Sequence, residues 1–191
     1  SILMLVLSGV IVGAVFEAFT SLIKFIADPE QKLPAITYWL MGSMAGTSWG
    51  DIIKAVPLIS LSIVILWLLR WRLNVISLNE DEAISLGINI KQTRLLIIVT
   101  TTIIASVSVS FCGVIAFVGL AVPHLMRMVC GNDHRVLVSA NCLGGGIFLL
   151  VIDTLARSAT ASEIPLSILT AVVGAPIFAI LLHKTGGVWD D

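Results

Sequence analysis

The side chains that could do chemistry in this chain are few and widely spaced. His124 and Arg127 precede a second group, Asp133-His134-Arg135, and such residues could form an acid–base or metal site. No nucleophile arrangement stands beside them, so we predict no catalytic residue, no cofactor and no metal site. An intramembrane enzyme using His124 and His134 is kept as an alternative. Three cysteines lack metal-ligand spacing and fit apolar segments as small hydrophobes: Cys112, Cys130 and Cys142.

Glu17 is a carboxylate inside an otherwise apolar stretch near the N-terminus. An ionised group there is costly unless it faces water, a cavity or a partner. Ser21 and Lys24 follow at helical spacing, so one face of this helix becomes polar along its length. We predict that Glu17 and Ser21 line a translocation path; pairing of Glu17 with Lys24 is the alternative.

Asp153 and Arg157 are four residues apart near the end of another apolar stretch. This spacing allows an ion pair within one helix. Arg157 could instead present its guanidinium to an acidic partner. The residues by themselves favour the local pair.

The composition defines what must position these groups. The chain has 191 residues, of which 58% are hydrophobic and only 12% charged, and its mean hydropathy is +1.06. A soluble domain carries about a quarter of its residues charged, and a bilayer core is crossed by about 20 apolar residues. We therefore predict an all-α polytopic membrane bundle that contacts lipid. The net charge of −1 gives no indication of a nucleic-acid partner.

Six apolar stretches are long enough to be considered as membrane segments, and the fourth is short enough to be partly re-entrant. If both chain ends are cytoplasmic, the inner loops hold more Lys and Arg than the outer loops, as the positive-inside rule requires. A further short helix is expected on the outer side. The predicted membrane segments are residues 2–25, 52–69, 95–111, 114–128, 136–155 and 164–182.

The longest polar stretch on the inner side, Arg72 to Arg94, contains one short helix signal. Ser77 and Glu80 have capping-box spacing, with Asn79 as an alternative cap, and Gly87 supplies a left-handed stop. A helix of about two turns is marginal alone, so it must dock on something. Docking on its own bundle and docking on a cytoplasmic partner are both open at this point.

A series of motifs resembles the FecCD-type permeases, the membrane subunits of importers for ferric siderophores, haem and vitamin B12. The run Gly113-Val-Ile-Ala-Phe-Val-Gly-Leu-Ala-Val-Pro-His-Leu-Met-Arg127 carries the family signature, with Gly119, Pro123, His124 and Arg127 at its fixed positions. Further matches along the chain, in order, are Trp39-Leu-Met-Gly42-Ser43, Glu82-Ala83-x-x-Leu86-Gly87, Asp133-His134-Arg135, Asp153-Thr-Leu-Ala-Arg157, Glu163-Ile-Pro165 and Gly174-Ala-Pro176.

The resemblance implies a multi-pass subunit of the cytoplasmic (inner) membrane of a prokaryote. It implies a second permease copy, two cytoplasmic ATPase subunits and an extracytoplasmic substrate-binding protein as partners. The short inner helix resembles the element that couples to the ATPase, through Asp81, Glu82, Ala83, Leu86 and Gly87. Arg157 resembles a residue that contacts the binding protein, which reverses the preference for the local pair. Family members import a metal chelate by alternating access and catalyse no covalent chemistry.

The sequence matches the last six of the family's ten helices, and we expect residues 1–191 to form a single permease domain that does not transport by itself. No phosphate-binding Gly-x-x-x-x-Gly-Lys-Ser/Thr loop occurs, so ATP must be bound by another chain. An ion-driven secondary transporter is the remaining alternative. It would require paired carboxylates or broken helices within the membrane, whereas Glu17 alone is truly intramembrane.

Overall fold

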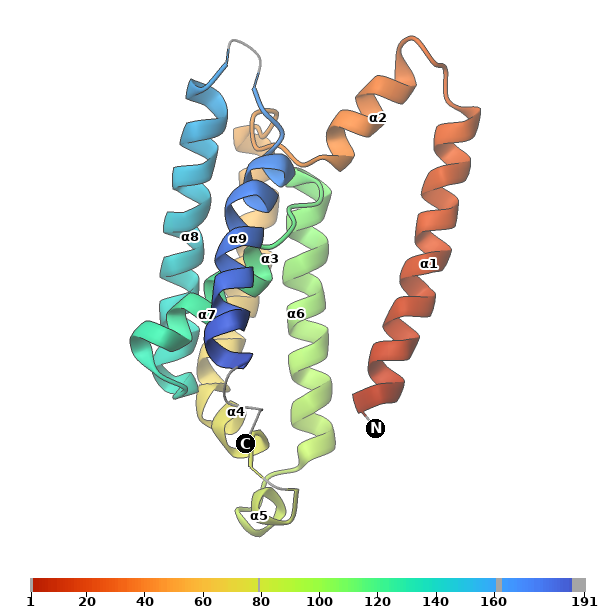
Figure 1. The fold of residues 1–191 in the computed structure, drawn as a ribbon. Coiled ribbons are helices and arrows are strands. Elements are labelled where there is room, and N and C mark those ends of the chain that lie inside the picture. Colours follow the sequence, from red (N-terminus) through yellow and green to blue (C-terminus); the bar gives the residue numbers. More distant parts are fainter. Residues whose placement is uncertain (1, 79, 161–162, 187–191) are drawn as a thin grey trace. The chain divides into compact units, whose positions relative to one another are not determined.

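The structure is a computed structural model that describes residues 2–78, 80–160 and 163–186, without the side chains of residues 2, 80, 81 and 181–186. Every regular element in these ranges is a helix (Figure 1). The chain forms two compact units, Ser1–Leu40 and Met41–Asp191, which are described separately. The all-α prediction is confirmed, while the single domain over residues 1–191 stays a prediction.

The first unit contains α1 (Ile2–Ile26) and α2 (Lys32–Leu40). None of the described α1 side chains is buried, although the helix is apolar along most of its length. Asp28 Oδ1 accepts hydrogen bonds from the backbone N–H groups of Glu30 and Gln31 and so shapes the turn between the two helices. The short outer helix expected from the sequence corresponds to α2.

The second unit begins with a long helix, α3 (Trp49–Leu68), and a short one, α4 (Arg70–Ile76). Ser48 and Asp51 form a reciprocal capping box that starts α3, in which each side chain accepts from the other residue's backbone N–H. The Arg70 guanidinium lies 3.9 Å above the Trp67 ring where α3 ends, a cation–π contact at the predicted inner interface.

The remaining helices are α5 (Glu80–Ser85), α6 (Ile90–Cys112), α7 (Val118–Cys130), α8 (His134–Ser158) and α9 (Leu166–Gly186). Within the second unit, α3 packs on α6, and α7 packs on both α8 and α9. Figure 1 shows α4, α5 and the first turns of α6 and α8 at one end of this unit. We call this the inner end. The outer end holds the start of α3 and the ends of α6 and α8.

Among the residues that the structure describes, four helices are long and apolar enough to cross a bilayer: α1 over Leu3–Ile26, α3, α6 and α8. The thirteen residues of α7 span only about 20 Å at 1.5 Å per residue, which confirms that this segment is short. The helix α9 is 21 residues long, and its part with described side chains, Leu166–Ile180, is apolar. Exposed leucines, isoleucines and valines on these helices fit contact with lipid or with further helices.

A backbone junction ties the outer end of the second unit together. The N–H of Ser43 donates to the Cys112 carbonyl, and the N–H of Leu166 donates to the Gly42 carbonyl. In both bonds the nitrogen–oxygen distance is 2.9 Å. Leu166 is buried there beside Ile152 and Ala156 of α8. The segment after α2 is therefore held between the end of α6 and the start of α9.

Candidate functional sites at the two ends of the helix bundle

The short helix α5 packs within the second unit, and Ala83 is the buried residue among its described side chains. Ala83 is 1% exposed and packs with Val75 of α4 and with Ile88, which follows α5. A helix therefore forms where the coupling helix was predicted, and it rests on its own bundle, while its coupling role stays a prediction. The prediction that Ala83 contacts a partner is not supported by its position, because its side chain is covered from within the chain.

The end of α5 explains why Ala83 points inward. Gly87 has φ +75°, its N–H donates to the Ile84 carbonyl, and the N–H of Ile88 donates to the Ala83 carbonyl. These two bonds define a Schellman motif, which brings the residues at its two ends, Ala83 and Ile88, into apolar contact. The predicted left-handed stop at Gly87 is confirmed.

Two apolar side chains near Ala83 are exposed, one within α5 and one directly after it. Leu86 is 52% exposed and Ile84 is 62% exposed, at the inner end where no lipid core would cover them. Glu82 is also exposed, while the side chain of Asp81 and the whole of Asn79 lie outside the described residues. Ile84 was not predicted from the sequence. The Schellman spacing could have assigned Ala83 to the inner face and so left Ile84 outside.

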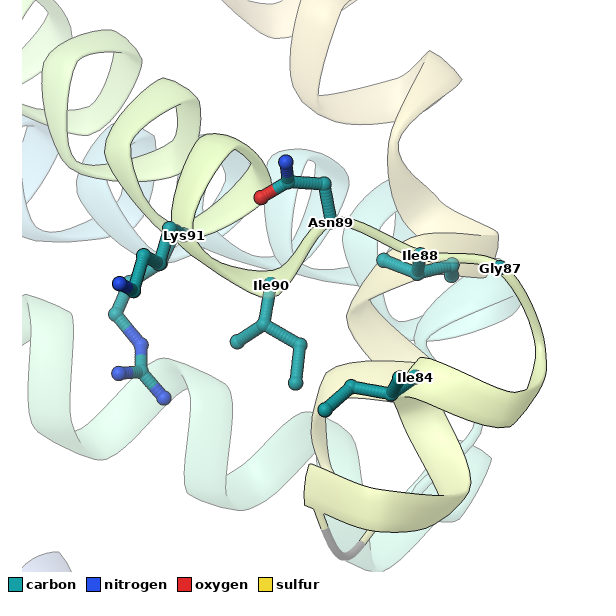
Figure 2. Close-up of a pocket in the computed structure, with 7 residues that line it drawn as sticks. Ile84, Gly87, Ile88, Asn89, Ile90 and Lys91 are labelled. Atoms are coloured by element: carbon teal, nitrogen blue, oxygen red, sulfur yellow. The ribbon is translucent and has the colours of Figure 1, made fainter.

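A hollow of about 550 Å³ lies beside this exposed face. Figure 2 shows Ile84 of α5 extending toward Ile90 at the start of α6, with Lys91 on the far side. Ile88, Asn89 and Arg94 complete the wall together with Gly87. The hollow thus combines apolar and basic side chains, a combination that suits a protein partner with apolar and acidic groups.

The outer end presents Arg157, in the last turn of α8. Its Nε donates a hydrogen bond to Asp153 Oδ2 at a distance of 2.8 Å, and its Nη1 lies 3.9 Å from Glu163 Oε1. The local pair considered from the sequence is therefore formed. The Arg157 side chain nevertheless stays 44% exposed, so the guanidinium is held in place while part of it faces outward.

The predicted path residues lie in the first unit. Glu17 and Ser21 are both exposed on α1, one turn apart. The described residues show no ion pair between Glu17 and Lys24. The role of Glu17 and Ser21 in a translocation path stays a prediction.

The signature positions build the α6–α7 connection and α7 itself. Phe117 adopts φ 64° before α7, Pro123 lies within α7, and Gly119 and Arg127 are exposed on it. The His124 ring packs edge-on against Phe178 of α9, with centroids 6.5 Å apart. This contact fixes how α7 meets α9.

His134 is placed separately from His124. Its ring Nδ1 lies 2.8 Å from Asn74 Oδ1 at the inner end. Neither histidine is near a nucleophile in any contact of the described residues, and those residues contain no group of three His, Cys, Asp or Glu that could hold a metal ion. Cys130 ends the short helix α7 and Cys142 lies on α8, and both are exposed, while Cys112 is partly buried.

The long apolar helices, the docked inner helix and the charged outer end define an integral membrane protein of the permease class. The chain belongs to the FecCD transport family, whose model matches residues 1–184. It is a multi-pass membrane protein of a transport family and not an enzyme.

Curated relatives agree with this assignment. The chain is 43% identical over 185 residues to the molybdate import system permease MolB of Haemophilus influenzae, covering 96% of this chain and 55% of that protein. It is 40% identical over 179 residues to the cobalamin permease BtuC of Halobacterium salinarum, covering 94% and 48%. It is 39% identical over 182 residues to the hemin permease HmuU of Yersinia pestis, covering 94% and 54%. The chain spans about half the length of these relatives.

A solved structure matches with a TM-score of 0.93 and 42% identity, covering 96% of this chain and 60% of that one. It is assigned to the metal-chelate type of ABC transporter and is in an inward-facing conformation. The similarity therefore extends from the sequence motifs to the arrangement of the helices.

Proposed function

We propose that this chain forms part of the permease of an ATP-binding-cassette importer in the inner membrane of a prokaryote. The observation that carries the proposal is the α5 segment, which is docked through Ala83 while Ile84 and Leu86 stay exposed at the inner end. Apolar residues in that position have no lipid to cover them, and a cytoplasmic ATPase subunit is the partner that the family supplies.

The proposed mechanism is alternating access. Two ATPase subunits close on ATP, α5 transmits the movement, and helices around the path rock between outward and inward openings in a pair of permease copies. Glu17 and Ser21 are the proposed path residues. Because an external binding protein selects the cargo, the path needs only weak contacts with it.

The proposed cargo is a metal-containing or oxyanion nutrient that a binding protein can deliver. Relatives are named for cobalamin, hemin and iron chelatin, which agree with the metal chelate predicted from the sequence. Another relative is named for molybdate, which broadens that class to an oxyanion. These relatives are all named as permeases, but they are named for different cargoes.

The first test is replacement of Leu86 by arginine in the permease co-expressed with its ATPase. A charge at this exposed position should disrupt an apolar contact with the ATPase while leaving the buried Ala83 contact intact. We expect roughly a tenfold or greater loss of co-purified ATPase, the usual effect of removing a central apolar contact, with unchanged permease yield.

Trp49→Arg is the matched control, because Trp49 is 80% exposed at the start of α3, at the outer end. It adds the same charge away from the cytoplasm and should leave ATPase capture unchanged. Equal capture by wild type and Leu86→Arg would remove α5 from the interface. Failure of the wild-type permease to capture any ATPase would refute the importer assignment.

At the outer end we propose that Arg157 binds a carboxylate of the binding protein. Asp153 orients the guanidinium through Nε, and the exposed part of the side chain meets the partner. Arg157→Glu should weaken binding of the binding protein to the permease by roughly a hundredfold, since one charge pair is lost and a repulsion is created. Surface plasmon resonance with the permease in nanodiscs measures this affinity.

Lys54→Glu makes the same charge change at another exposed residue of the outer end, near the start of α3. We expect this control to bind within about threefold of wild type, as rim charges usually do. An Arg157→Glu variant that keeps wild-type affinity would leave Arg157 with its local pair as its only role.

A further inference from the structure

Asn74 of α4 joins two segments that lie about sixty residues apart in the sequence. Its Nδ2 donates a hydrogen bond to Asp133 Oδ1 at a distance of 2.6 Å. Its Oδ1 accepts a hydrogen bond from the backbone N–H of His134. Both the backbone nitrogen and the ring Nδ1 of His134 lie 2.8 Å from this Oδ1. One side chain therefore holds both the N-cap residue and the first residue of α8.

The chemistry of these partners fixes the orientation of the Asn74 amide. A carboxylate only accepts and a backbone N–H only donates, so Nδ2 must face Asp133 and Oδ1 must face His134. The same Oδ1 requires a proton on His134 Nδ1. Both Nδ2 and Oδ1 of Asn74 therefore form hydrogen bonds that join α4 to the start of α8.

The contact also completes the N-terminus of α8. Asp133 Oδ1 accepts from the N–H of Arg135, while the preceding N–H, that of His134, is satisfied by Asn74 from another helix. The hydrogen bonds from Asn74 and from the Arg135 backbone lower the pKa of Asp133, which stays ionised at neutral pH.

Asn74 lies at the inner end, beside α5 and at the start of the helix that leads to the outer end. One residue along α4, Val75 packs on Ala83 of α5. In the other direction, α8 runs 25 residues, or about 37 Å, from the Asn74 contact to the outer end, where Arg157 lies in its last turn. A single helix therefore connects the inner docking segment with the outer charged site.

We propose that Asn74 is a positioning residue that locks the inner end of α8 to the α4–α5 segment, so that the two move together during transport. This inference rests on the proposed function, since it requires α5 to be moved by an ATPase. The ion-pair-like hydrogen bond to Asp133 and the bond to the His134 backbone give the lock two polar contacts with fixed geometry. A lock of this kind transmits movement in either direction along α8.

The test uses the complete transporter, permease and ATPase, in liposomes with its binding protein. Asn74→Leu keeps the size of the side chain and removes all three polar contacts. We expect ATPase capture and ATP hydrolysis to persist while cargo uptake per ATP falls roughly tenfold, the effect of losing one hydrogen bond to a charged group. A residue with only a structural role would change yield and not this ratio.

A second variant tests the same contact without removing polar groups. Asn74→Asp alone places two carboxylates against each other and should uncouple the transporter as Asn74→Leu does. Adding Asp133→Asn to this variant restores a donor and an acceptor across the contact. Asparagine also caps helices well, so α8 keeps its N-cap. Uptake per ATP should therefore return most of the way to the wild-type value.

Wild-type uptake per ATP in Asn74→Leu would overturn the inference. The inference would also be overturned if the double variant Asn74→Asp with Asp133→Asn captured ATPase normally but had the same low uptake per ATP as Asn74→Asp. Failure of the wild-type permease to capture ATPase would instead refute the proposed function itself. The two failures are therefore distinguished by the co-purification step.

Discussion

Replacing Gly42 by alanine is expected to destabilise the permease by about 3 kcal/mol, because two independent costs meet at this position. Gly42 has φ +74°, where a side chain is strained, and a Cβ added there would lie 2.6 Å from the Val114 carbonyl oxygen. The obstructing atom belongs to the backbone and cannot rotate away. In detergent, the thermal midpoint should fall by roughly 6–12 °C, measured by fluorescence-detected size exclusion.

The surrounding hydrogen bonds explain why the chain cannot avoid this clash. Gly42 is held on one side by Leu166 of α9 and its neighbour Ser43 is held on the other by Cys112 of α6. Moving the backbone to relieve the contact would break these bonds. We therefore expect the loss to be of folded protein as a whole rather than of one partner contact.

Gly46→Ala is the matched control for this prediction. Gly46 belongs to the same connection, has nothing within 4 Å of its added Cβ and is not among the glycines with positive φ. Its thermal midpoint should stay within about 2 °C of wild type, as for most exposed substitutions. Equal midpoints for the two variants would mean that the junction at Gly42 tolerates a side chain.

Replacing Ala83 by aspartate is expected to release α5 from the second unit. The Ala83 side chain is 1% exposed against Val75 and Ile88, so a carboxylate there would be buried without a partner at a cost of about 3 kcal/mol. A short helix should come away from its neighbours rather than bury this charge. We expect chymotrypsin, which cleaves after leucine, to cut after Leu78 or Leu86 on either side of α5 roughly tenfold faster or more, and ATPase capture to be lost.

Ser85→Asp supplies the control, since Ser85 is exposed on the same helix and donates only to the Glu82 carbonyl. It should keep the wild-type cleavage rate. The comparison with Leu86→Arg separates the buried Ala83 from the exposed Leu86, because Leu86→Arg should lose the ATPase without faster cleavage after Leu78. Wild-type cleavage in Ala83→Asp would contradict the docking of α5 through Ala83.

The sequence by itself determined the class of this protein and most of its helices. Long apolar runs and scarce charges require a membrane bundle whatever the packing, and the motif around Gly119, Pro123 and Arg127 identified the family. The end of α5 at Gly87 was also readable, because a left-handed stop depends on local backbone sterics. Such features arise from residues close together in the chain.

Tertiary structure alone decided which side of each element is available. Ala83 and Leu86 were predicted to act together, yet one is buried and the other is exposed, because a helix of under two turns is too short for its pattern to show a face. Asn74 stood out in no motif, since its partners are about sixty residues away. Contacts between distant segments depend on how the helices pack, and neither local propensity nor hydropathy records that packing.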